Sequence, residues 1–208
     1  MPRVCNIIVI PEDTDHANVA RGYFHGRNVD DRAYQVYQKW TGKNGNFDRV
    51  RQWVVENVRA QARKLRRFGI IAMIDEDGTG PTARRQRISG ELRNLMLPDF
   101  DPCQGRLLVL PVRNVETWMV WGARWDAAGR LTSPTSPAAF PAVDETHDYK
   151  RRRTISGQLL PSEPQMQAFA LGCAIAELNP ANPPAGVPPA LAAILRPWSD
   201  FLDWTRQP

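Results

Sequence analysis

Acidic side chains follow two apolar stretches of the chain, at the points where each stretch ends. Glu12 comes just after residues 4–10, and Asp75 and Asp77 come directly after residues 70–74. Two carboxylates separated by one residue point the same way in an extended chain, because successive side chains alternate. Carboxylate oxygens suit Mg²⁺, which keeps several waters and can also hold a phosphate. Glu12, Asp75 and Asp77 are therefore predicted to bind a metal ion and to be catalytic.

A further acid, Glu116, follows a third apolar stretch at residues 107–110. It falls in the first turns of a helix predicted over residues 112–121, among bulky apolar side chains. A carboxylate in such surroundings needs a partner, which a metal ion or Arg113 would supply. Glu116 is thus predicted to be an accessory catalytic acid, with a favourable helix-dipole interaction as the alternative.

The residues beside these acids have simpler interpretations. Asp13 and Asp15 suit a turn and a helix cap, and Asp75 itself could cap a turn. Alternation along the strand directs Glu76 away from Asp75. His16 is expected to be a surface residue of the helix that follows Glu12, with an assisting role at the acidic turn as the alternative.

The apolar pattern predicts the fold that would bring these acids together. Residues 4–10, 70–74 and 107–110 are short, apolar and rich in β-branched or branched side chains, which is typical of buried strands. Helices are predicted over residues 14–23, 28–40, 47–67, 81–97, 112–121, 164–178 and 188–205. Strands that alternate with helices predict an α/β fold with a mostly parallel, Rossmann-like sheet and helices on both faces. Functional groups gather at the carboxyl ends of such strands.

The length and composition favour one core with an appendage. Residues 1–125 are predicted to form the α/β core, and residues 126–208 an irregular Pro-rich excursion and closing helices packed on it. No apolar run approaches the roughly 20 residues that a membrane span needs, and the three cysteines lie far apart. A cytoplasmic protein with no membrane partner is expected, and a homo-oligomer is possible.

The three strand ends together resemble a known family. The stretches I-I-V-I-P-E-D-T-D (7–15) and I-I-A-M-I-D-E-D-G (70–78) resemble the Toprim fold of topoisomerases, primases and overcoming-lysogenization-defect nucleases. The stretch L-L-V-L-P-V-R-N-V-E-T-W-M-V-W (107–121) is similar to a segment of small Toprim-like proteins of bacterial defence loci, the DUF4276-type and RloB-like proteins. The resemblance covers about residues 1–125. It departs at Asp13, where Toprim proteins usually have glycine.

The resemblance implies a nuclease that depends on Mg²⁺ or Mn²⁺ and acts in antiviral defence with a partner ATPase. Glu12 would be an acid/base or a metal ligand, Asp75 and Asp77 would be ligands, and Glu116 an accessory acid. The net charge of +5 favours a polyanionic partner, DNA or RNA. The candidate nucleic-acid-binding residues are Arg84, Arg85, Arg87, Arg113, Lys150 and Arg151. The basic face of the helix at 47–67 is either a solvated surface or a contact for phosphates.

Two other classes of function stay open. A non-catalytic binding subunit would use aromatic anchors, for most of which core packing is the alternative: Trp118, Trp121, Trp125, Trp198 and Trp204. A receiver-like phosphotransfer domain would form an acyl-phosphate on Asp75. The chain has no G-x-x-x-x-G-K-[ST] motif, so ATP hydrolysis by this chain alone is not expected.

Overall fold

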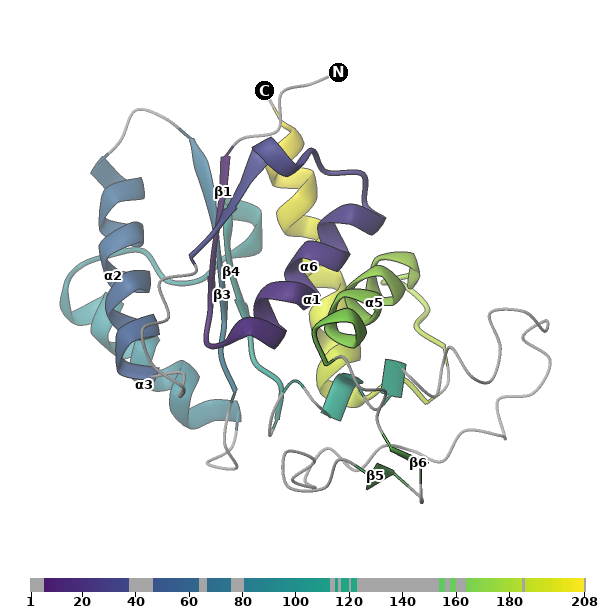
Figure 1. Ribbon diagram of the computed structural model, residues 1–208. Coiled ribbons are helices and arrows are strands. Elements are labelled where there is room, and N and C mark those ends of the chain that lie inside the picture. The colour runs from purple at the N-terminus through teal and green to yellow at the C-terminus, as the bar shows by residue number, and fades with distance from the viewer. Residues whose placement is uncertain are drawn as a thin grey trace.

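The computed structural model describes residues 6–37, 47–63, 67–75, 81–112, 115, 117–119, 121–122, 154–155, 158–159, 164–184 and 186–207. At its centre is a four-stranded sheet in the order β2-β1-β3-β4, in which every neighbouring pair is parallel. The strands are β1 (Asn6–Pro11), β2 (Tyr34–Val36), β3 (Phe68–Met73) and β4 (Arg106–Val109). This arrangement confirms the predicted α/β fold with a parallel, Rossmann-like sheet (Figure 1). A separate short hairpin pairs β5 (Thr154–Ile155) with β6 (Gln158–Leu159).

The helix predicted over residues 28–40 is wrong. A 3-10 turn at Asp31–Ala33 leads into β2, which pairs with β1 in the register Ile7 with Tyr34. Asp30 caps this turn by accepting a hydrogen bond from the backbone N–H of Arg32 at 2.8 Å. The segment is a strand because its β-forming residues fit the half-buried edge of the sheet, and this tertiary pairing overrides a weak local helical pattern.

One face of the sheet is covered by helices from both ends of the described chain. They are α1 (Thr14–Gly26), α5 (Pro164–Glu177) and α6 (Pro189–Arg206) (Figure 1). Alternate side chains of the strands enter this core, among them Ile7 and Val9 of β1 and Ile71 and Met73 of β3. None of the helices in the described residues has the length and apolar character that a membrane span requires.

The opposite face is covered by α2 (Phe47–Arg63) and α3 (Pro81–Asn94). The strand residues between those of the first core, such as Ile70 and Ala72, enter this second core with Val54 and Ile88 from the two helices. A strand that is buried on both faces shows no polar alternation, which is why β3 is apolar throughout. The prediction of helices on both faces is confirmed.

Three of the tryptophans proposed as binding anchors lie in the core, whereas Trp204 is half-buried and Trp125 lies outside the described residues. Trp118 and Trp198 are fully buried, and Trp121 is 4% exposed. Trp198 stacks on Tyr23 of α1 with 4.1 Å between the ring centroids. The alternative interpretation, that these side chains serve packing, is therefore the one that the structure supports.

Burial of Tyr23 makes the stability of the protein sensitive to alkaline pH. Burial raises the pKa of Tyr23 to about 12, whereas an unfolded tyrosine titrates near pH 10. The resulting stabilisation is complete below about pH 10 and is lost as the pH rises towards 12. Tyr23→Phe removes this effect, so the variant should gain roughly 1 kcal/mol relative to wild type between about pH 8 and pH 11. Urea unfolding of both proteins at about pH 8 and pH 11 measures this gain. If the free energies of unfolding of variant and wild type differ by the same amount at the two pH values, the prediction is contradicted.

Two helices that are far apart in the sequence cross at very short range. A Cβ atom at Gly22 of α1 would lie 1.9 Å from the carbonyl oxygen of Phe169, and one at Gly172 of α5 would lie 2.1 Å from that of Val19. Real Cβ atoms never approach so closely, so each position requires glycine. This crossing ties α1, which begins beside Glu12, to α5.

Candidate metal centre

The register of the sheet brings Glu12 and Asp75 together. Pro11 at the end of β1 pairs with Met73 at the end of β3, and the backbone N–H of Glu12 donates to Met73 O at 2.8 Å. Both carboxylates therefore emerge at the same edge of the sheet. The backbone N–H of Asp75 donates to Oε2 of Glu12 at 2.7 Å, which fixes the Glu12 carboxylate against β3.

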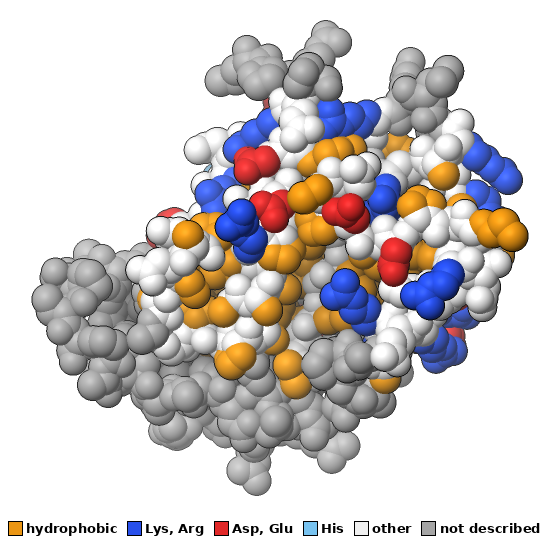
Figure 2. All heavy atoms as spheres, turned by 180° about the vertical axis from the view of Figure 1, so that it is seen from behind, with side chains coloured by type: hydrophobic (Ala, Val, Ile, Leu, Met, Phe, Trp, Pro, Cys, Tyr) orange, Lys and Arg blue, Asp and Glu red, His pale blue; other side chains and the backbone are white. Residues whose placement is uncertain are grey.

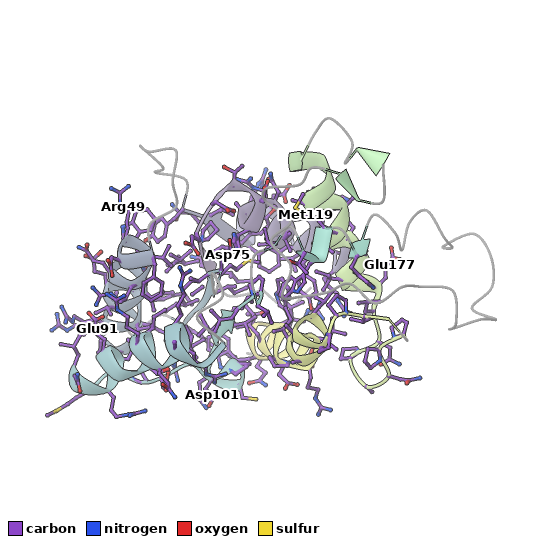
Figure 3. All side chains as sticks on the ribbon, turned by 90° about the horizontal axis from the view of Figure 1, so that it is seen from below. Arg49, Asp75, Glu91, Asp101, Met119 and Glu177 are labelled. Atoms are coloured by element: carbon purple, nitrogen blue, oxygen red, sulfur yellow. The ribbon has the colours of Figure 1, made fainter. Side chains whose placement is uncertain are left out.

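Asp75 lies in the interior, between the helices of the two faces (Figure 3). Its side chain is 1% exposed, and its Oδ1 accepts a hydrogen bond from the backbone N–H of Val115 at 2.9 Å. Val115 belongs to the segment that follows β4, so one carboxylate joins the ends of two neighbouring strands. The burial of Asp75 requires cationic or donor partners, because an isolated carboxylate is strongly destabilised away from water.

His16 supplies the second partner of Asp75. Its Nε2 lies 3.1 Å from Asp75 Oδ1, and its Nδ1 lies 2.7 Å from Oδ1 of Asp13. The same oxygen of Asp13 caps α1 by accepting the backbone N–H of His16 at 3.0 Å. The imidazole is fully buried, so its ring spans the two carboxylates. Asp13, His16 and Asp75 each offer one ligand atom, all within 4.8 Å of one another, which is an arrangement that can hold a metal ion.

The expectation that His16 is a surface residue is wrong. His16 precedes Val19, Ala20 and Tyr23 at helical spacing, and all four are among the buried residues of α1. The helical spacing of His16 with these apolar residues is the signal in the sequence that it is buried. The polar character of the imidazole favours the opposite prediction, an exposed side chain. The N-cap of α1 also differs from the prediction, since Asp13 and not Asp15 accepts the capping hydrogen bond.

The neighbouring charges change the pKa values of His16 and Glu12. Burial alone would lower the pKa of His16, but the carboxylates of Asp13 and Asp75 outweigh it and hold the pKa well above its usual value. Burial and the neighbouring Asp75 raise the pKa of Glu12, and His16 and Arg84 oppose this shift. Glu12 thus holds a proton more readily than an exposed glutamate, which is a property of acid/base catalysts.

Arg84, one of the predicted nucleic-acid-binding residues, lies inside the site, where it contacts Glu12 and Asp75. Its guanidinium lies 3.2 Å from Oε2 of Glu12 and donates to the backbone carbonyl oxygen of Asp75. The side chain is 15% exposed and also lies over the ring of Phe47, 4.9 Å from its centroid. Arg84 therefore positions Glu12 and holds α3 against the ends of β1 and β3.

The other predicted basic residues are separate from this cluster or outside the described residues. Arg85 is exposed, and the exposed Arg87 pairs with Asp48 at 2.9 Å. The remaining site predictions fall outside the residues that the structure describes: Asp77, Glu116, Arg113, Lys150 and Arg151.

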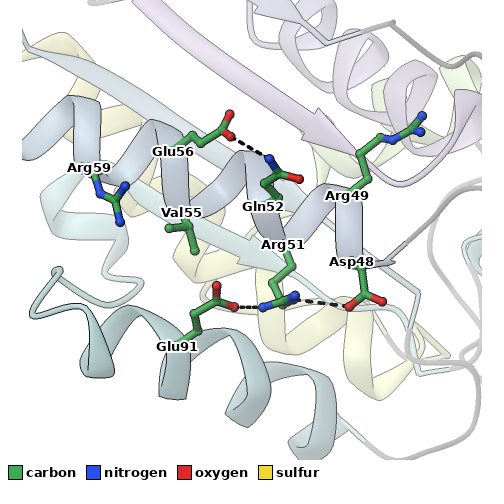
Figure 4. Close-up of a pocket in the computed structure, with 8 residues that line it drawn as sticks. All are labelled: Asp48, Arg49, Arg51, Gln52, Val55, Glu56, Arg59 and Glu91. Carbon is green, nitrogen blue, oxygen red and sulfur yellow. Dashed lines mark hydrogen bonds and ion pairs between the residues drawn. The ribbon is translucent and has the colours of Figure 1, made fainter.

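A groove between α2 and α3 contains several of the basic residues of α2 that were considered as phosphate contacts. It has a volume of about 470 Å³, and Arg51 within it pairs with Glu91 and lies 3.4 Å from Asp48 (Figure 4). Three arginines and three acidic residues line it, so their charges cancel. Basic and acidic side chains are also interspersed on the face shown in Figure 2. The described part of α2 thus favours the solvated-surface interpretation of its basic residues.

No protein-family model, curated protein or solved structure matches this chain. The resemblance to Toprim proteins therefore stays a prediction.

Proposed function

We propose that this protein is a metal-dependent nuclease that cleaves phosphodiester bonds at the Glu12–Asp75 edge of the sheet. The observation that carries the proposal is the pair of buried carboxylates at the carboxyl ends of the adjacent parallel strands β1 and β3. Asp75 also forms, with Asp13 and His16, a cluster whose ligand atoms lie close enough together to hold a metal ion. The proposed ion is divalent, Mg²⁺ or Mn²⁺, as the carboxylates predict.

The residues of the site divide between holding the ion and moving a proton. A bound divalent ion would stabilise negative charge on the phosphate and lower the pKa of a bound water. Asp75 would be its principal ligand, because this buried carboxylate belongs to the cluster with Asp13 and His16 and also lies beside Glu12. Glu12 has the raised pKa of a general acid/base, and Arg84 and the Asp75 N–H hold its carboxylate in one orientation.

The receiver-like alternative is disfavoured by the surroundings of Asp75. An acyl-phosphate on this residue requires a carboxylate oxygen that a phosphoryl donor can reach. Asp75 is 1% exposed, and its Oδ1 contacts both Val115 N and His16 Nε2. A buried carboxylate that is held in this way suits a ligand better than a nucleophile.

The wider biological setting is proposed from the resemblance alone. The substrate would be DNA or RNA, the partner an ATPase, and the role antiviral defence. The positive net charge of the chain supports a polyanionic substrate.

Glu12→Gln tests the proposed chemistry. Glutamine keeps an oxygen that can accept the Asp75 N–H, but it cannot exchange a proton at neutral pH, so the cleavage rate should fall at least about 100-fold. The measurement is cleavage of labelled single-stranded DNA, duplex DNA and RNA with Mg²⁺ or Mn²⁺. Asp200→Asn is the matched control, because it removes a carboxylate of α6 that lies 3.4 Å from Arg196. Equal cleavage by Glu12→Gln and wild type would rule out this role for Glu12.

A further inference from the structure

The buried imidazole in the acidic cluster bears on the kind of ion that the site selects. We infer that His16 Nε2 and Asp75 Oδ1 are a ligand pair for a first-row transition-metal dication such as Zn²⁺ or Co²⁺, with Asp13 as the anchor of the imidazole. The inference rests on the proposed metal-dependent function and specifies the ion that this function uses. The carboxylates alone predict Mg²⁺ or Mn²⁺, and the imidazole adds a preference for a transition-metal ion over Mg²⁺.

The separation of the two atoms fits two ligands of one ion. Zn²⁺ binds imidazole nitrogen and carboxylate oxygen at about 2.0–2.2 Å, so two ligands of one ion lie roughly 3.0 Å apart at a right angle and roughly 3.4 Å apart at the tetrahedral angle that Zn²⁺ prefers. Nε2 and Oδ1 are 3.1 Å apart. The bond that Oδ1 accepts from Val115 N holds the carboxylate in place.

Asp13 prepares the imidazole for this role. Imidazoles that bind metals usually donate their other N–H to a carboxylate, which fixes the tautomer and the orientation of the ring. The 2.7 Å contact between His16 Nδ1 and Asp13 Oδ1 is of this kind. Asp13 is itself held by its capping bond to the backbone N–H of His16, so the anchor is built into the first turn of α1.

The second nitrogen of His16 is the independent observation that points to an ion. Nε2 is fully buried and forms no aligned hydrogen bond with the described residues, although it lies beside Asp75. A buried polar atom without a hydrogen bond is uncommon and calls for an unseen partner such as water or an ion. The position between an imidazole and a carboxylate favours a cation.

The chemistry of the donors then selects the class of cation. Imidazole nitrogen suits Zn²⁺ and other transition-metal ions, whereas Mg²⁺ takes oxygen ligands and gives up its waters reluctantly. A site of carboxylates alone would lack this source of discrimination. His16 is thus proposed to determine metal specificity.

The test combines metal titration with NMR of protein whose histidines carry ¹⁵N. Zn²⁺ is expected to shift Nε2 of one histidine in wild type, and this shift should be lost in His16→Gln and kept in His25→Gln. His25 is the matched control because it is exposed at the other end of α1. Calorimetry should show Zn²⁺ affinity lowered roughly 10- to 100-fold in His16→Gln, with a much smaller change for Mg²⁺.

A second variant protects the test against a folding defect of His16→Gln. Asp13→Asn keeps a good helix cap and weakens only the charge that anchors Nδ1. It should lower Zn²⁺ affinity by roughly 10-fold and leave Mg²⁺ affinity close to that of wild type.

Failure of this inference differs from failure of the proposed function. Absence of Zn²⁺ binding, or binding without a shift of His16, would overturn the inference, and the imidazole would then be a counter-ion of two carboxylates. Metal-dependent cleavage would still stand in that case. Coordination by His16 without cleavage of any nucleic acid would instead overturn the nuclease and leave the metal specificity supported.

Discussion

Asp75→Asn is expected to abolish metal-dependent cleavage and to lower the affinity for divalent ions by more than about 100-fold. Asparagine keeps the oxygen that accepts the Val115 N–H, so the packing at the strand ends should persist. The substitution removes the central negative charge of the cluster, which contacts His16 and lies beside Glu12. The loss of function should therefore arise from the loss of charge and not from unfolding.

Calorimetry with Mg²⁺, Mn²⁺ and Zn²⁺ and the cleavage assay measure the two effects of this substitution. Urea unfolding without metal shows whether the fold is retained, and Asp200→Asn again controls for the loss of one carboxylate. Wild-type metal affinity in Asp75→Asn would place the ion elsewhere and would remove the basis of the proposed site.

Gly172→Ala is expected to lower the free energy of unfolding by about 3 kcal/mol or more. The new Cβ would meet Val19 O at 2.1 Å and Tyr23 N at 2.6 Å, and both are backbone atoms that cannot rotate away. The helices must separate, and the core between α1 and α5 must then lose contacts. Urea unfolding with circular dichroism measures the change.

Gly90→Ala is the matched control, because it makes the same substitution in α3. A Cβ at Gly90 meets nothing within 4 Å, so the better helix propensity of alanine should raise stability by about 0.5–1 kcal/mol. Similar effects of the two substitutions would mean that the α1–α5 crossing is not as close as the structure shows.

The sheet was predictable to the extent that its strands are largely apolar. β1, β3 and β4 contain apolar runs that stand out in the sequence, and the alternation with helices implied their parallel pairing. β2 was missed because a three-residue strand at a sheet edge, with its middle residue exposed, carries almost no periodic signal. Its pairing with β1 is a tertiary effect that local preferences do not encode.

The site was predictable where side chains follow strands directly. Glu12 and Asp75 were placed together because both follow apolar runs, and the adjacency of β1 and β3 brings them into contact. His16 was misplaced because a polar residue in the first turn of a helix is ordinarily exposed. Arg84 could not be told apart from Arg85 or Arg87, since only the packing of α3 decides which of them points inward.

The crossing of α1 and α5 also constrains the order in which the protein acquires its structure during synthesis. α1 follows β1 immediately, but its partner α5 lies at Pro164–Glu177, so most of the described chain separates the two. Contacts between such distant segments form late, because the intervening chain must first be made and then closed into a loop. The helix that carries His16 therefore leaves the ribosome before the helix that packs on it has been synthesised. The candidate metal centre should form only after α5 has emerged.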